Sequence, residues 1–207
     1  MSYLGGECGI AALKRFLAPA PWTPTDPHKI GLPDSPWYSI DLGPIHYIQY
    51  STEHDVSAYS PQHKFILADL ATLNRTLTPF LVVGGHRPMH ISSPDGVDPT
   101  SNLLAGEEVL KAFEDLFFLH EVDLLLHGHH HGYQRTYPIY KRTVTPGAPV
   151  YVVAGNAGYQ LTLYIQPKTP DYYQVGWVKS FDQILVQELS YIHEMQNSEI
   201  ELKVLRE

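Results

Sequence analysis

The chain has 207 residues, of which 43% are hydrophobic and 12% aromatic, and its formal net charge is -8 at pH 7. This length fits one domain and the composition can form a packed core, which excludes a wholly disordered chain. The single cysteine excludes a disulfide framework and a cysteine-rich zinc module, and the acidic balance argues against nucleic acid as a partner.

The chain begins with an irregular lead-in followed by a hairpin. Residues 1–36 are rich in Pro and Gly and show little periodicity, so we expect irregular structure there. Two short runs of aromatic and β-branched residues, 37–40 and 45–50, flank the turn residues Gly43-Pro44 and predict a β-hairpin.

Helical and strand patterns then alternate along the chain. Apolar side chains recur at helical spacing in two segments, and short apolar runs between and after them predict buried strands. This order is typical of an α/β fold with parallel strand pairing. In chain order the expected elements are helix 62–74, strand 80–83, helix 106–120, and strands 122–126, 150–154, 184–188 and 200–204.

The sequence shows no recognisable membrane-spanning segment or signal peptide. No apolar stretch approaches the ~18 residues of a membrane-spanning helix, so we expect no membrane partner. Residues 1–9 show neither the basic nor the apolar part of a signal peptide. The sequence pattern therefore assigns no compartment, and it assigns no oligomeric state.

Twelve histidines are the most unusual feature of the composition, and five of them come just after predicted strands. His86 follows one strand, and the run His127-Gly128-His129-His130-His131 follows the next. Ligands of open α/β sheets bind beyond the carboxyl ends of strands, so both groups should converge if the two strands share a sheet. Alternate residues of an extended segment point the same way, which places His129 and His131 together and His130 away. Because imidazole binds zinc and iron well, the pattern predicts a metal site.

Simpler interpretations apply to the remaining candidates. Within the run, His127 and His130 are interpreted as bystanders. Cys8 could be a thiol nucleophile, but it lies in the irregular lead-in, and we interpret it as a buried structural cysteine. The chain has no phosphate-binding loop and no nucleophile elbow. The isolated histidines, which we interpret as surface or core residues, are His28, His46, His54, His63, His120 and His193.

Several motifs occur here in the order in which one enzyme family has them. They are Gly5-Gly6-Glu7-Cys8-Gly9, Trp37-Tyr38-Ser39, Ser51-Thr52-Glu53-His54-Asp55, Gly85-His86-Arg87-Pro88, Gly128-His129-His130-His131, Tyr133-Gln134-Arg135-Thr136-Tyr137-Pro138 and Pro149-Val150-Tyr151-Val152-Val153-Ala154-Gly155. Together they resemble the purple acid phosphatases, dinuclear enzymes of the calcineurin-like metallophosphoesterase superfamily. The resemblance covers nearly the whole chain. It implies the C-terminal part of a four-layer α/β/β/α sandwich that is incomplete at its N-terminus.

The resemblance also implies a domain plan and a set of site residues. Residues 37–146 would be the C-terminal half of the metallophosphoesterase domain, and residues 147–207 the family's C-terminal segment, packed on the same domain. His86 and His129 would bind a divalent metal ion (zinc, manganese or iron), and His131 would bind a ferric ion. His90 is the one candidate for a phosphate contact, although relatives often have Tyr there.

The implied activity is hydrolysis of small phosphomonoesters by a metal-bound hydroxide, with the metal ions supplying the positive charge that an acidic chain lacks. Relatives are commonly secreted or vacuolar. The family's motifs Gly-Asp-x-Gly, Gly-Asp-x-x-Tyr and Gly-Asn-His-Glu, which supply the other ligands, are absent from this sequence. We therefore expect the dinuclear centre only in a longer chain that carries them. Gln134 also replaces the usual Glu of its motif.

Three hypotheses follow from these matches and departures. The first is an acid phosphatase of which this chain carries the histidine half of the metal site. The second is a truncated, catalytically inactive remnant that binds at most one metal ion. The third is a fragment that does not fold alone, because loss of the first half of a sandwich exposes apolar strand edges.

Overall fold

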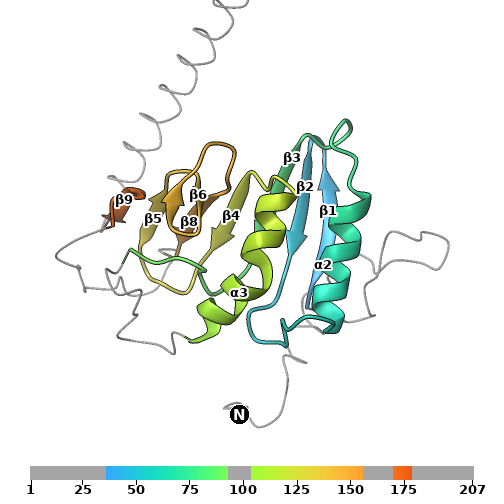
Figure 1. Cartoon of the computed structure of the whole chain (residues 1–207), viewed down its shortest axis with the longest axis horizontal. Coiled ribbons are helices and arrows are strands. Elements are labelled where there is room, and N and C mark those ends of the chain that lie inside the picture. The colour runs from blue at the N-terminus through green and yellow to red at the C-terminus, as the bar shows by residue number, and fades with distance from the viewer. Residues whose placement is uncertain (1–35, 93–103, 156–169, 179–207) are drawn as a thin grey trace, which may run out of the picture.

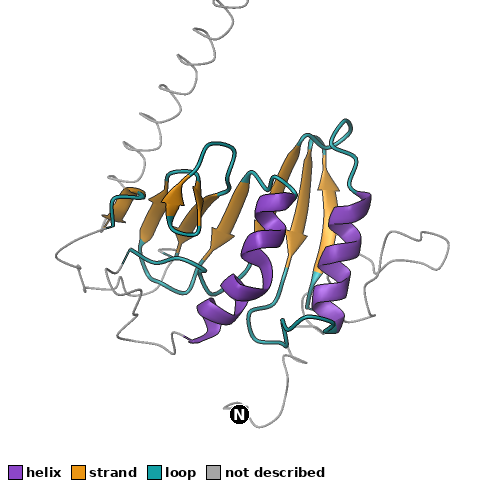
Figure 2. Cartoon of the chain, in the orientation of Figure 1, coloured by secondary structure: helices purple, strands orange, loops and turns teal. Residues whose placement is uncertain are grey.

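The computed structural model describes residues 36–92, 104–155 and 170–178, and these form one mixed β-sheet with two helices on one face (Figures 1 and 2). The seven strands follow the order β1-β2-β3-β4-β8-β5-β9, and β6 and β7 form a separate hairpin. Strands β2, β3, β4 and β8 are parallel, whereas β1, β5 and β9 run antiparallel to their neighbours. The bounds are β1 Tyr38–Leu42, β2 Ile45–Gln49, α2 Pro61–Thr72, β3 Phe80–Gly84, α3 Leu104–Leu119, β4 Leu124–His127, β5 Tyr133–Thr136, β6 Ile139–Tyr140, β7 Thr143–Val144, β8 Val150–Ala154 and β9 Tyr173–Val178.

The predicted α/β class and the parallel pairing of the central strands are confirmed. The hairpin, both helices and the first three buried strands also occur within two residues of their expected bounds. The lead-in 1–35 and the expected strands 184–188 and 200–204 lie outside the described residues. In the described part of the chain, no helix is long and apolar enough to cross a membrane.

Each helix forms because its sequence combines an apolar face with suitable ends. Helix α2 starts at Pro61, which needs no partner for a backbone N–H, and the side chain of Ser60 accepts a hydrogen bond from the backbone N–H of His63. Helix α3 buries Val109, Phe113 and Phe117, as the spacing predicts.

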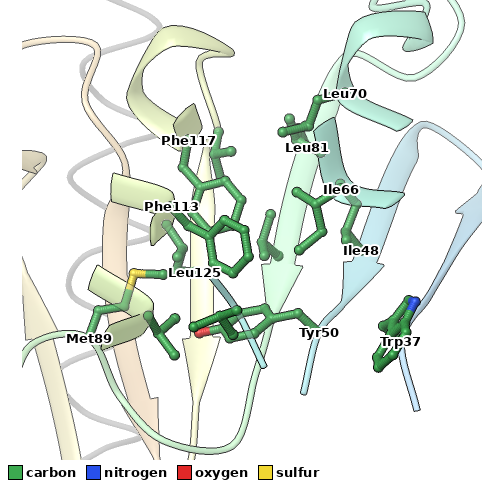
Figure 3. Close-up of a cluster of buried hydrophobic side chains, with 14 of the residues drawn as sticks. Trp37, Ile48, Tyr50, Ile66, Leu70, Leu81, Met89, Phe113, Phe117 and Leu125 are labelled. Carbon is green, nitrogen blue, oxygen red and sulfur yellow. The ribbon is translucent and has the colours of Figure 1, made fainter. Parts of the chain in front are cut away.

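The main core lies between the two helices and the sheet (Figure 3). Leu81 and Val83 of β3 point into it and are fully buried, whereas Phe80, on the other face of the strand, is 53% exposed. The rings of Phe113 and Phe117 stack with centroids 5.4 Å apart, and Tyr50 meets Phe113 edge-on at 6.0 Å. The core thus reaches the carboxyl ends of the central strands, where Tyr50 follows β2.

A buried polar contact, which we call the His46 tie, joins the hairpin to α2. The imidazole of His46 lies 2.6 Å from Asp41 Oδ1 through Nδ1 and 2.8 Å from Asp69 Oδ2 through Nε2. The hydroxyl of Ser39 donates to the other oxygen of Asp69 at 2.7 Å. Burial lowers the pKa of His46, but the hydrogen bonds and charges of Asp69 and Asp41 outweigh it, so the pKa is raised. The tie therefore favours a charged imidazole.

Candidate metal centre

Two neighbouring parallel strands bring His86 and His129 together. Strands β3 and β4 pair with Val83 opposite Leu125, so both carboxyl ends lie at one edge of the sheet. Beyond the strands the pairing continues, since the backbone N–H of Gly128 donates to the carbonyl of His86 at 2.9 Å. Nδ1 of His129 lies 3.1 Å from Nε2 of His86, and the two rings are nearly perpendicular. The predicted convergence of the two histidine groups is confirmed for this pair.

The histidine run is not an extended strand, which corrects the reason given for its side-chain directions. His129 has a φ of 64°, in the left-handed region, and lies inside a three-residue turn closed from His130 N–H to the Gly128 carbonyl at 2.7 Å. A second such turn joins Gly132 to His130 at 2.8 Å. Alternation along a strand therefore does not apply here.

His131 lies near this pair. It acts electrostatically on His86, which places it in the same neighbourhood. Within residues 36–92, 104–155 and 170–178, however, no three His, Cys, Asp or Glu side chains are arranged to hold a metal ion. The assignment of His131 to a metal ion stays a prediction.

The His86–His129 pair fits one metal ion as two nitrogen ligands. Two nitrogens each bound to zinc at about 2.0–2.1 Å in a tetrahedral arrangement lie about 3.3 Å apart. The observed separation of 3.1 Å is close to that value. The pair thus offers two ligands of one coordination shell, and the described residues contain no group of three such ligands.

An ion pair beside His86 was not predicted from the sequence. The guanidinium of Arg87 contacts Glu53 through Nε at 2.6 Å and through Nη2 at 3.3 Å. This hydrogen bonding lowers the pKa of Glu53 against the opposing effect of burial. The pKa of His86 is lowered because its ring is partly buried, while the charge of Glu53 opposes this shift. The family motif at residues 51–55 includes Glu53, but it indicates no role for this residue and no pairing with Arg87.

His90 and His127 lie in the core beside the pair. Nε2 of His90 is 3.4 Å from a Glu114 oxygen, and its ring meets the Tyr151 ring edge-on at 4.6 Å. Since His90 is 4% exposed, a phosphate contact from it stays a prediction without geometric support. His127 is equally buried, and burial, with a smaller effect of His90, lowers its pKa to about 3. Its Nε2 lies 2.9 Å from the hydroxyl of Tyr50.

Known proteins resemble this chain in both sequence and structure. It is 36% identical over 162 residues to "Probable inactive purple acid phosphatase 9" of Arabidopsis thaliana, covering 74% of this chain and 24% of that protein. It is 37% identical over 144 residues to human "Acid phosphatase type 7", covering 59% of this chain and 33% of that protein. A purple acid phosphatase from yellow lupin seeds superposes with a TM-score of 0.69 and 28% identity, over 86% of this chain and 30% of that chain.

The chain is a relative of the purple acid phosphatases. No family model matches it. The chain spans between a quarter and about a third of the length of the two relatives just named. The purple acid phosphatase resemblance seen in the motifs is therefore confirmed, for a region that is only part of each relative.

Proposed function

We propose that this chain supplies the histidine side of a metal-dependent acid phosphatase that hydrolyses small phosphomonoesters. The proposal is carried by one observation, the 3.1 Å contact between His86 and His129 at the carboxyl ends of adjacent parallel strands. Parallel α/β sheets bind ligands at that edge. The relationship to purple acid phosphatases supports the same interpretation.

In this proposal His86 and His129 hold one divalent metal ion through the facing nitrogens, and His131 binds a second, ferric ion. Bound metal ions would neutralise the phosphate charge and lower the pKa of a water molecule. The residues of this chain hold the ligand side chains in place. The short turns of the histidine run fix His129, and the backbone hydrogen bond from Gly128 to His86 keeps the two loops in register.

The charge pattern agrees with a site whose positive charge comes from metal ions. The chain carries -8 at pH 7, so its overall charge repels an anionic ester. The cation next to His86 is Arg87, and Glu53 neutralises it. A phosphate group would therefore find little attraction from these side chains alone.

A second candidate function is metal binding without catalysis. One relative is named "Probable inactive purple acid phosphatase 9". The described residues also lack a group of three ligands. A chain that binds one metal ion weakly through two histidines and does not turn over phosphoesters would match both observations.

Zinc titration by calorimetry separates these functions from simple structural histidines. We expect the variants His86→Ala and His129→Ala to weaken zinc binding by at least about 100-fold, since even changes outside the ligand shell cost 10–100-fold. The matched control is His120→Ala, because His120 follows α3 at the opposite edge of the sheet. Zinc binding that survives both substitutions would overturn the site.

Hydrolysis of an aryl phosphate at acid pH then distinguishes catalysis from binding. We expect phosphate release to rise with added metal and to stop on chelation, and to be lost in His129→Ala. Zinc binding that depends on His129 without any release of phosphate would favour the non-catalytic candidate.

A further inference from the structure

We propose that Tyr50 and His127 form a positioning pair that sets the approach of His86 to His129. The inference deepens the proposed function and rests on it, because the two positioned side chains are the proposed metal ligands. Neither Tyr50 nor His127 would contact the metal ion. His127 immediately precedes the loop that carries His129, and the ring of Tyr50 packs against the loop that carries His86.

The first contact joins Tyr50 to the loop of His129. The Tyr50 hydroxyl and Nε2 of His127 lie 2.9 Å apart, across 77 residues of sequence, and both residues are buried. His127 is the last residue of β4, and Gly128 and His129 follow it. A shift of the imidazole of His127 would therefore move the start of the turn that holds His129.

The second contact joins Tyr50 to the loop of His86. A Cβ atom added to Gly85 would overlap the Tyr50 ring, so the ring packs directly on the backbone just before His86. Figure 3 shows the ring lying below Phe113, with its hydroxyl oxygen directed away from Ile48. Tyr50 thus contacts one ligand loop with its ring face and the other with its hydroxyl.

Two backbone hydrogen bonds also link the two ligand loops directly. The backbone N–H of Gly128 donates to the carbonyl of His86 at 2.9 Å, and that of Gly85 donates to the carbonyl of Leu126 at 3.0 Å. Together with Tyr50 and His127, these bonds fix the backbone of both loops on the core side. The imidazoles of His86 and His129 then meet on the outer side at 3.1 Å.

Packing alone does not explain why these two residues are polar. Tyr50 is 1% exposed among Ile48, Phe113 and Phe117, a setting in which phenylalanine would fill the same space. Burying a hydroxyl and an imidazole is costly unless they are hydrogen-bonded. The bond between them satisfies Nε2 of His127 and fixes the orientation of both side chains, while Nδ1 of His127 has no hydrogen-bond partner among the described residues. A directional contact at this point in the core is what ligand positioning requires.

The test compares two buried tyrosines that differ in one respect. The variant Tyr50→Phe removes the hydroxyl that contacts His127. The control Tyr151→Phe removes the hydroxyl of a tyrosine that is 3% exposed and also lies beside His127, but whose oxygen has no hydrogen-bond partner among the described residues. We expect Tyr50→Phe to weaken zinc binding by about 10-fold or more, and Tyr151→Phe by less than about twofold.

A double variant separates positioning from stability. Tyr50→Phe combined with His127→Leu replaces the polar pair by apolar side chains, which restores stability in many buried sites. We expect the double variant to have a free energy of unfolding at least as large as that of Tyr50→Phe alone. Its zinc binding should still be weak. Zinc affinity that returns to the wild-type value with stability would overturn the positioning role.

Imidazole NMR spectra of the metal-free protein keep the inference separate from the proposed function. If zinc binding by the wild-type chain does not depend on His129, the proposed function fails. The positioning role is then judged on the metal-free resonances of His86 and His129. These should shift in Tyr50→Phe and stay in place in Tyr151→Phe, and unchanged resonances in both variants would overturn the inference.

Discussion

The His46 tie makes a sharp prediction about how stability depends on charge and pH. The variants Asp69→Asn and Asp41→Asn each remove one negative charge opposite His46. They differ in environment, because the side chain of Asp69 is 6% exposed and that of Asp41 is 66% exposed. Both variants make the same chemical change, but Asp69 also accepts a hydrogen bond from Ser39, and this bond enters the comparison together with burial.

The expected magnitudes differ because water screens only one of the pairs. Removing one partner of a buried ion pair costs about 3–5 kcal/mol. The amide introduced by Asp69→Asn keeps an oxygen that can accept from Ser39, which reduces the loss to about 2–3 kcal/mol. An exposed pair contributes about 0–1 kcal/mol, so Asp41→Asn should cost less than about 1 kcal/mol. Urea unfolding followed by circular dichroism measures both values.

The sign of the pH dependence follows from the raised pKa of His46. A group whose pKa is higher in the folded state stabilises fully below its unfolded value of about 6.5, and this stabilisation is lost as the pH rises through the folded value. The difference between wild type and Asp69→Asn should therefore be larger at about pH 6 than at about pH 9. An equal difference at both pH values, or an equal cost for Asp41→Asn, would refute the charged tie.

Two further substitutions test the packing around the site and in the core. Gly155→Ala should lower the free energy of unfolding by more than about 3 kcal/mol, because the added Cβ would overlap the backbone carbonyl oxygen of His130. Gly43→Ala should lower it by only about 1–2 kcal/mol, because Gly43 has a φ of 60° but nothing lies near the added Cβ. Similar costs for both would contradict the close approach at Gly155. Phe113→Ala should cost about 3–5 kcal/mol, since its ring is fully buried against Phe117 and Tyr50; a thermal unfolding midpoint close to wild type would mean that the core is assigned wrongly.

The elements predicted from the sequence are those whose apolar pattern is locally complete. Strands β3 and β4 are short apolar runs, and α3 carries a clear stripe, so each can be recognised from its own residues. Strand β5 contains Gln134 and Arg135 and has no such pattern. The β6–β7 hairpin turns at Lys141 and Arg142, both with positive φ, where the usual signal would be Asn or Gly.

The site divides in the same way. His86 and His129 could be expected to meet, because both follow strands of one parallel sheet. The conformation of His129 could not be expected from the sequence. Its φ is left-handed, and the usual sequence signal for such a turn, a Gly, is absent at that position. The contact between Tyr50 and His127 joins residues 77 positions apart, and neither residue stands in a local pattern that indicates a partner.

The separation of 43 residues between His86 and His129 has a consequence for how the molecule assembles. The two rings can meet only after α3 has crossed over the sheet and β4 has docked beside β3, and such long-range parallel pairing is slow because a large loop must close first. The two imidazoles therefore come together only when this pairing forms, and a probe placed there would report the docking of β4 beside β3 during refolding.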